Sequence, residues 1–204
     1  MTTTTIERSQ AHWLTAILWL VASLIGYGLV GAMFHFPSGF PPNTDEFNLG
    51  AFFGGAMQGF LSGLVVGFLQ WLVLRRHIDR AGRWVLWTAV GLGVVHAFGD
   101  ALPDPVALPI IGLVGGLALG GTQWFMLRHI FDKAWLWPIT TAMSWAVGIN
   151  IGLVIIEAMG LLDQPWTPEV GATGHSIVGL AVGLVGGLAT GVLFGRMQQR
   201  ERTT

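Results

Sequence analysis

The chain has few side chains that could do chemistry, and four of them fall near one predicted depth. His96 and Asp100 stand four residues apart, so on a helix they share one face. Glu157 and His175 lie at the outer ends of two other apolar segments. Together these groups could bind a divalent metal ion or relay protons. The alternative is that each meets only water or loop amides at a wet helix end; we favour it and expect no metal or other cofactor.

Two amide side chains lie deeper in the apolar segments. Asn150 is near the middle of one segment and Gln58 is in another. Amides in lipid usually bond a neighbouring helix, at about 0.6 kcal/mol each. We therefore expect Asn150 to join two helices rather than to contact a substrate.

The residue types and motifs disfavour an enzyme. The chain has no cysteine, which excludes disulfides, thiolate metal sites and cysteine nucleophiles. It also lacks His-Glu-x-x-His, Gly-x-Ser-x-Gly and Gly-x-x-x-x-Gly-Lys motifs. No catalytic residue is predicted.

The elements that position these residues are apolar and long. Hydrophobic residues make up 52% of the 204 positions and charged residues 10%, against roughly 25% charged in soluble proteins. A membrane-spanning helix needs about 20 mostly apolar residues. Six such runs occur, and they are Trp13 to Phe34, Leu49 to Leu74, Trp84 to Leu102, Val106 to Leu127, Trp135 to Met159 and Ser176 to Gly195.

The basic residues predict the orientation, because cytoplasmic loops collect Lys and Arg. With six spans, all ten fall on one side: Arg8, Arg75, Arg76, Arg80, Arg83, Arg128, Lys133, Arg196, Arg200 and Arg202. Both termini are therefore expected in the cytoplasm. The first run exceeds a usual signal-peptide core and has no clean cleavage site, so we expect it to be retained. The prediction is an all-α, six-helix bundle in the plasma (inner) membrane, with residues 1–204 forming one domain.

A repeat runs through the middle of the chain. The segment from Gln70 to Arg75 reads Gln-Trp-Leu-Val-Leu-Arg and recurs 53 positions later (123 − 70) from Gln123 to Arg128. Trp84 and Trp137 each follow their glutamine by fourteen residues. The repeat predicts three tandem helical hairpins, each closed on the outer side.

Three rows of glycines accompany the repeat at four-residue spacing. Glycines four apart share a helix face and let another backbone approach closely. The rows either meet near a central axis or pack on their own hairpin partners. They are Gly59, Gly63 and Gly67, then Gly112, Gly116 and Gly120, then Gly179, Gly183 and Gly187.

The Gln-Trp-x-x-Leu-Arg tag with its glycine rows resembles a group of small, uncharacterised, multi-pass bacterial membrane proteins. The resemblance runs from Gly59 to about Ala146. It implies the membrane topology and no particular activity.

Tryptophan and arginine also point to the membrane surface. Most of the ten tryptophans are predicted near the inner boundary, as an aromatic belt, with stacking on a pigment, quinone or lipid ring as the alternative. The basic cluster should attract anionic headgroups, and it consists of Arg75, Arg76, Arg80 and Arg83. No nucleic-acid partner is expected.

The leading functional hypothesis is a non-catalytic accessory or scaffold bundle that meets lipid, a membrane protein partner or a second copy of itself. No predicted span carries a row of polar groups along its length, which a hydrated pathway ordinarily requires. The alternative is a small-solute or ion transporter or channel, because internal repeats often build transport sites near the midplane. A metal-dependent membrane enzyme is the third hypothesis.

Overall fold

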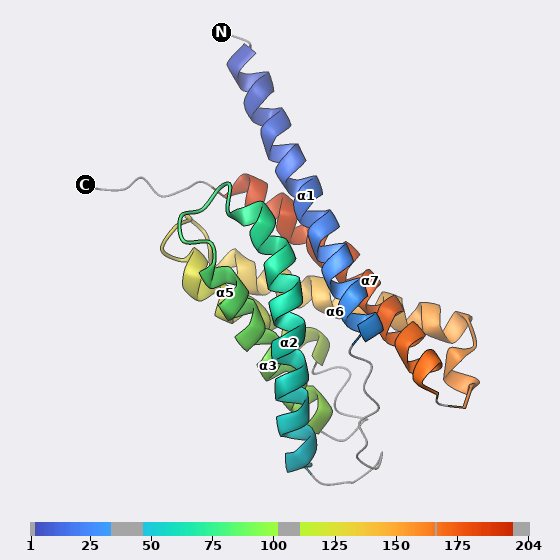
Figure 1. The fold of residues 1–204 in the computed structure, drawn as a ribbon. Coiled ribbons are helices and arrows are strands. Elements are labelled where there is room, and N and C mark those ends of the chain that lie inside the picture. The colour runs from blue at the N-terminus through green and yellow to red at the C-terminus, as the bar shows by residue number, and fades with distance from the viewer. Residues whose placement is uncertain (1–2, 34–46, 102–110, 166, 198–204) are drawn as a thin grey trace.

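The computed structural model describes residues 3–33, 47–101, 111–165 and 167–197, and its elements are all helical (Figure 1). This confirms the predicted all-α class for the described residues. In chain order the elements are α1 (Thr3–Met33), α2 (Leu49–Leu74), α3 (Arg83–Ala101), the π-helical turn η1 (Ile111–Gly115), α5 (Gly116–Leu127), α6 (Leu136–Ala158), the 3-10 turn η2 (Leu161–Asp163) and α7 (Pro168–Arg196).

Five helices are long and apolar enough to cross a membrane. They are α2, α3, α6, α7 and the part of α1 from Trp13 to Met33. The remaining predicted span, Val106 to Leu127, is described from Ile111 onward as η1 followed by α5. Its first residues lie outside the described ones.

Large apolar side chains cover the outward faces of these helices. Phe53 on α2 and Val154 on α6 are each 64% exposed, and Leu188 on α7 is 55% exposed. In water, contiguous apolar surface of this extent would drive aggregation. The exposed surface therefore suits contact with a lipid bilayer.

At the first turns of α2 and α7, side-chain capping helps to determine where the helix begins. Asn48 precedes α2, and its Oδ1 accepts a hydrogen bond from the Ala51 N–H at 3.0 Å, so α2 begins as predicted. α7 begins eight residues before the predicted Ser176 (176 − 168). Thr167 caps it by accepting from the Val170 N–H, and Pro168 suits the first turn. The prediction from hydropathy placed the start of this helix too late, because its first turns contain polar residues.

The six helices close into a ring. Each packs against two others, in the order α1, α2, α3, α5, α6, α7 and back to α1. The α1 and α7 helices lie side by side along most of their shared length, although they stand at opposite ends of the chain (Figure 1). The ring is thus closed by contact between its first and last helices.

The glycine rows form three of the six contacts in this ring. A Cβ added at Gly63 would collide with the Ala89 backbone of α3. One at Gly116 would lie 2.7 Å from Ala142 Cα of α6, and one at Gly183 2.9 Å from Leu24 Cα of α1. Real Cβ atoms essentially never come this close to another backbone.

The partners of the rows differ from both arrangements considered from the sequence. The α2 row faces α3 and the α5 row faces α6, each across the short basic loop rather than the outer loop. The α7 row faces α1. The rows therefore meet neither one another nor the partner across the outer loop.

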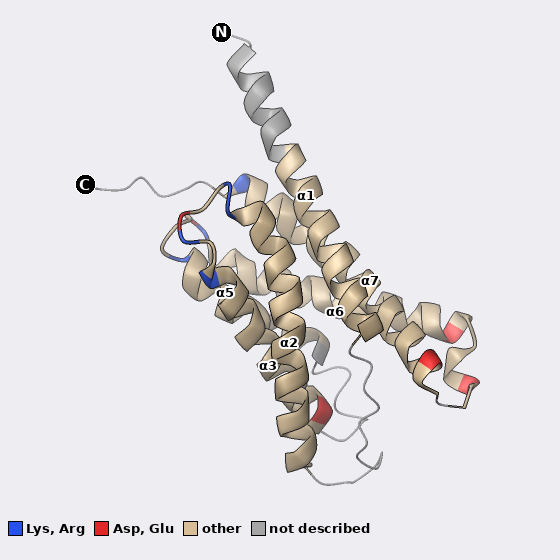
Figure 2. Ribbon diagram, in the orientation of Figure 1, with Lys and Arg blue, Asp and Glu red and all other residues tan. Residues whose placement is uncertain are grey.

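Charge is separated along the ring. Figure 2 shows Lys and Arg gathered at the end that carries the loops from α2 to α3 and from α5 to α6, whereas most Asp and Glu colour the other end. We call these the basic end and the acidic end. The separation is the one that the six-span orientation requires.

Candidate functional site

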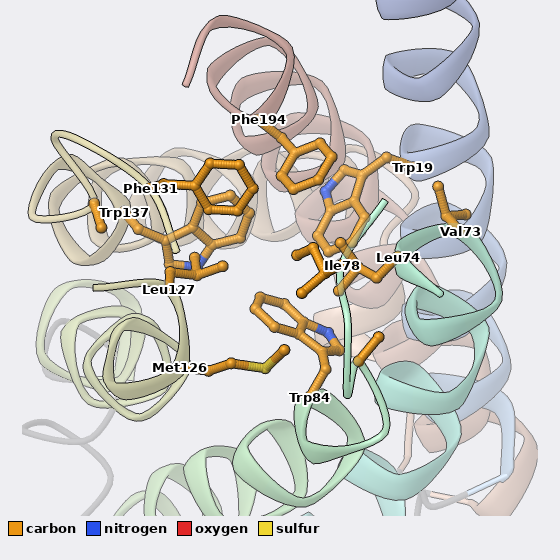
Figure 3. Packing of buried hydrophobic residues seen from close by; sticks show 12 residues of the cluster. Trp19, Val73, Leu74, Ile78, Trp84, Met126, Leu127, Phe131, Trp137 and Phe194 are labelled. Atoms are coloured by element: carbon orange, nitrogen blue, oxygen red, sulfur yellow. The ribbon is translucent and has the colours of Figure 1, made fainter. Parts of the chain in front are cut away.

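Three buried indoles meet on the axis of the ring near the basic end (Figure 3). Trp19 comes from α1, Trp84 from α3 and Trp137 from α6, and none is more than 1% exposed. Their ring centroids are 5.5 to 5.8 Å apart, and each pair packs edge to face. Such pairs contribute about 0.5–1.5 kcal/mol beyond the area they bury. The indoles fill the centre of the bundle.

Each indole N–H needs an acceptor, and the first repeat supplies Gln70. Trp84 Nε1 donates to Gln70 Oε1 at 2.9 Å. The amide nitrogen of Gln70 donates in turn to Ser23 Oγ at 3.0 Å, which links α2 to α1. A single glutamine thus ties three helices together through buried, neutral hydrogen bonds.

The second repeat makes the same arrangement 53 residues later. Trp137 Nε1 donates to Gln123 Oε1 at 2.8 Å, and Gln123 Nε2 donates to Thr88 Oγ1 at 3.1 Å. The fourteen-residue spacing between glutamine and tryptophan, noted from the sequence, therefore reflects a direct hydrogen bond.

The third arrangement is split between the two ends of the chain. Trp19 Nε1 of α1 donates to Thr190 Oγ1 of α7 at 2.9 Å. Thr190 follows Gly187 by three residues, as Gln70 follows Gly67 and Gln123 follows Gly120. The helices α7 and α1 thus correspond to α2 with α3 and to α5 with α6. We call these three helix pairs sectors.

The two loops at the basic end repeat as well, and they cover the indoles. Arg80 and Lys133, 53 positions apart, both adopt left-handed backbone angles with φ of 59°. Ile78 and Phe131 are buried in the same cluster as the indoles. The axis is therefore closed at this end by side chains from both loops.

The tryptophan prediction was incomplete. Trp19, Trp84, Trp137 and Trp145 are buried inside the ring rather than placed in an interfacial belt. The reason is that each of the first three indoles has a buried acceptor, which removes the need for the wet interface. Trp13 and Trp135 are largely exposed, as belt anchors would be.

A small cavity lies beside the polar side chains. Its volume is about 20 Å³, and its walls include Ser23, Gln123, Thr141, Ser144 and Thr190. Among the residues that the structure describes, no charged side chain lines it. The cavity can offer neutral hydrogen bonds, but it has no group suited to nucleophilic or acid and base chemistry at neutral pH.

The predicted polar cluster at the acidic end is brought together only in part. His96 and Asp100 lie beside α2, where a Cβ at Gly55 would come 2.6 Å from Asp100 Oδ2. His175 is within electrostatic range of both, and its ring nitrogen Nδ1 bonds the Gly171 carbonyl of its own helix. Glu157 is exposed near the end of α6.

Within the part of the chain that the structure describes, no group of three or more His, Asp or Glu residues is placed to hold a metal ion. The convergence of all four residues therefore stays a prediction. The metal-dependent enzyme hypothesis finds no support in this geometry.

The deep amides behave differently from one another. Asn150 is exposed on the outer face of α6, and its Nδ2 donates to the Ala146 carbonyl of the same helix at 2.7 Å. The expectation that Asn150 joins two helices is therefore wrong within this chain, because its amide bonds the backbone of its own helix. Gln58 is half-buried on α2.

The sequence carried a signal for the hydroxyl residues that our reading missed. Each tryptophan on the axis is followed four residues later by Ser or Thr, at Ser23, Thr88 and Thr141. Residues four apart share a helix face, so these hydroxyls point the same way as the indoles. Comparing the first helix with the two repeats would have revealed the pattern.

Comparisons with protein-family models, with curated proteins and with solved structures each found no match.

Proposed function

We propose that this protein is an integral membrane protein of six spans that serves as a non-catalytic accessory or scaffold bundle. The observation that carries the proposal is the closed axis of the ring. A transport route through a single bundle would follow that axis, and three mutually packed indoles occupy it. The polar side chains beside them are already bonded to one another.

The proposed orientation puts both termini and both basic loops in the cytoplasm. It is supported by the charge separation in Figure 2 and by the rule that Lys and Arg stay inside. The chain has no native cysteine, so single cysteines report cleanly. A cysteine at Asp104 should react with an impermeant maleimide in intact cells, and one at Lys133 only after the inner side is opened. The reverse pattern would refute the orientation.

A permeability assay tests the closed axis. Purified protein in liposomes should dissipate a proton gradient, a potassium diffusion potential and a urea gradient no faster than protein-free liposomes. As a positive control, Trp84→Ala with Trp137→Ala removes two of the three indoles and should increase leakage if the bundle still folds. Faster dissipation by the unmodified protein would favour the transporter or channel alternative.

The transporter alternative draws on one specific feature, the cavity lined by hydroxyl and amide side chains near the axis. A solute crossing there would have to displace the indole cluster on the basic side. The same assay separates the two functions, because only a transporter moves a probe when no side chain has been removed.

The basic loops give the scaffold a defined contact with lipid. Arg75 lies over the Trp71 ring at 5.2 Å, and Arg128 lies over the Trp124 ring at 5.1 Å. A ring held at the headgroup level can orient the guanidinium toward the membrane surface. We propose that these arginines, with Arg76, Arg80 and Arg83, bind anionic headgroups. Each such contact contributes about 1 kcal/mol.

A further inference from the structure

The three sectors differ at two equivalent positions, spaced four residues apart on one helix of each pair. In the α2 sector these are Val66 and Gln70, and in the α5 sector they are Leu119 and Gln123. The equivalent positions on α7 hold only Gly186 and Thr190. The α7 sector therefore has a glycine where the other two have an aliphatic side chain, and a shorter threonine where they have a glutamine.

The cavity occurs where this volume is lost. Gly186 and Thr190 line it, together with Thr141 and Ser144 of the adjoining helix α6. A Cβ added at Gly186 would meet only Ser144 Oγ, at 3.7 Å, whereas Cβ atoms added in the glycine rows would strike backbone. The space thus belongs to the α7 sector and does not come from loose packing of the whole ring.

The walls retain hydrogen-bonding capacity of both kinds. Ser144 Oγ donates to the Thr141 carbonyl and Thr141 Oγ1 to the Trp137 carbonyl, so both oxygens keep lone pairs that can accept. Gln123 Nε2 carries two N–H groups and gives one to Thr88. A guest molecule can therefore donate to α6 and accept from α5.

Size and charge define the guest. A water molecule needs about 10–15 Å³ of such space and two to four polar partners, and the cavity of about 20 Å³ provides both. The absence of charged side chains among its lining residues disfavours an ion, whose desolvation would be uncompensated.

We propose that the cavity is a binding site for a single water molecule, which replaces the missing glutamine amide and bridges the α7 sector to α6. In the other two sectors a glutamine Nε2 reaches the hydroxyl of an adjoining helix. Thr190 is too short for that contact and instead donates to the Gly186 carbonyl of its own helix. The water takes over the bridging role.

The test compares the unmodified protein with a variant that copies the other sectors. Gly186→Leu with Thr190→Gln supplies the side chains found at Leu119 and Gln123. In structures at a resolution that shows buried water, the unmodified protein should have one density peak within 3.5 Å of at least two wall oxygens or nitrogens. The variant should have none, and its introduced glutamine should bond Trp19 and Thr141.

A second measurement does not depend on whether the variant folds. In the unmodified protein in micelles, the Gly186 amide should show a nuclear Overhauser effect to water of the sign and size expected for a bound molecule. The matched control is the amide of Gly116, where an added Cβ would lie 2.7 Å from Ala142 Cα of α6, and this amide should show none. A protein without this effect, or an empty cavity at high resolution, would overturn the proposal.

Discussion

The α2 and α5 sectors bind their neighbours by glutamine, whereas the α7 sector has only a threonine at the equivalent position. Gln70 reaches Ser23 on α1, and Gln123 reaches Thr88 on α3. Thr190 bonds Trp19 and its own helix. Two junctions of the ring therefore have a direct buried polar link, whereas the junction of α6 with α7 is made by packing and by the proposed bridging water.

At that third junction, glycines of α6 allow the backbone of α7 to approach closely. A Cβ at Gly148 of α6 would lie 2.7 Å from Val182 Cα of α7, and one at Gly152 would lie 2.8 Å from Val178 Cα. Close backbone approach gives many small dispersion contacts, which in lipid replace the absent hydrophobic drive. Glycines of α1 and α3 also approach α2 and α5 closely, so glycine contacts occur at all three junctions. The comparison shows that the glutamine links add to close packing at two junctions rather than replace it.

The largest expected effect comes from breaking a feature that all sectors share, the glycine rows. Gly63→Leu should lower the free energy of unfolding by at least about 3 kcal/mol, because α2 and α3 must separate to admit the side chain. The matched control is Gly121→Leu on α5, where an added Cβ meets no described atom within 4 Å. Equal thermal unfolding temperatures in detergent would show that the row is not an interface.

The next largest loss of stability is expected when the glutamine of a glutamine-containing sector is replaced. Gln123→Leu removes the acceptor of Trp137 Nε1 and the donor to Thr88 Oγ1 at once. Leaving such buried groups without partners should lower stability by about 1–3 kcal/mol. Chemical unfolding in mixed micelles measures the change. An unaltered unfolding midpoint would mean that the network contributes nothing to stability.

Thr190→Val should have a smaller effect than Gln123→Leu, of about 1 kcal/mol, because it breaks only one bond between helices. The cavity beside Thr190 also leaves room for adjustment. Both variants should be unfolded under identical conditions. If the threonine variant proved the less stable of the two, the ranking of the sectors would be wrong.

The smallest effect is expected on the outer surface. Asn150→Leu should change stability by less than about 0.5 kcal/mol, because the amide is exposed and bonds only its own helix. The thermal unfolding temperatures of the Asn150→Leu and Gln123→Leu variants should be measured under identical conditions and compared. A loss as large as that of the glutamine variant would restore the interhelical role first expected for Asn150.

Much of the ring could be predicted from the sequence, for identifiable reasons. Apolar length placed five helices, and α2 matched its predicted bounds of Leu49 and Leu74. The spacing of Gln70 to Trp84 was visible in the sequence, but the hydrogen bond between them was not. A repeat shows which residues are equivalent, but it does not show toward which neighbour each helix face is turned. Asn150 was misread for the same reason.

The third sector escaped prediction because its two halves lie at opposite ends of the chain. Trp19 has no glutamine fourteen residues before it, so no local pattern marks it. Only the glycine row that ends at Gly187 shows that Thr190 is equivalent to Gln70 and Gln123. Long-range pairing of this kind has to be established in three dimensions.

The closed ring depends on the pairing of α1 with α7 within one chain, and cysteine cross-linking measures this pairing directly. Gly112→Cys in η1 with Ala146→Cys in α6 is the reference pair, since a Cβ at Gly112 would lie 3.7 Å from Ala146 Cβ, close to disulfide geometry. Ser23→Cys with Gly187→Cys is the test pair; its two Cβ atoms would lie 3.0 Å apart, so α1 and α7 must separate slightly to accommodate the disulfide. Both pairs should form intramolecular disulfides on mild oxidation. Covalent dimers from the test pair, with the reference pair still linked internally, would show that the third sector forms between copies and would contradict the closed ring.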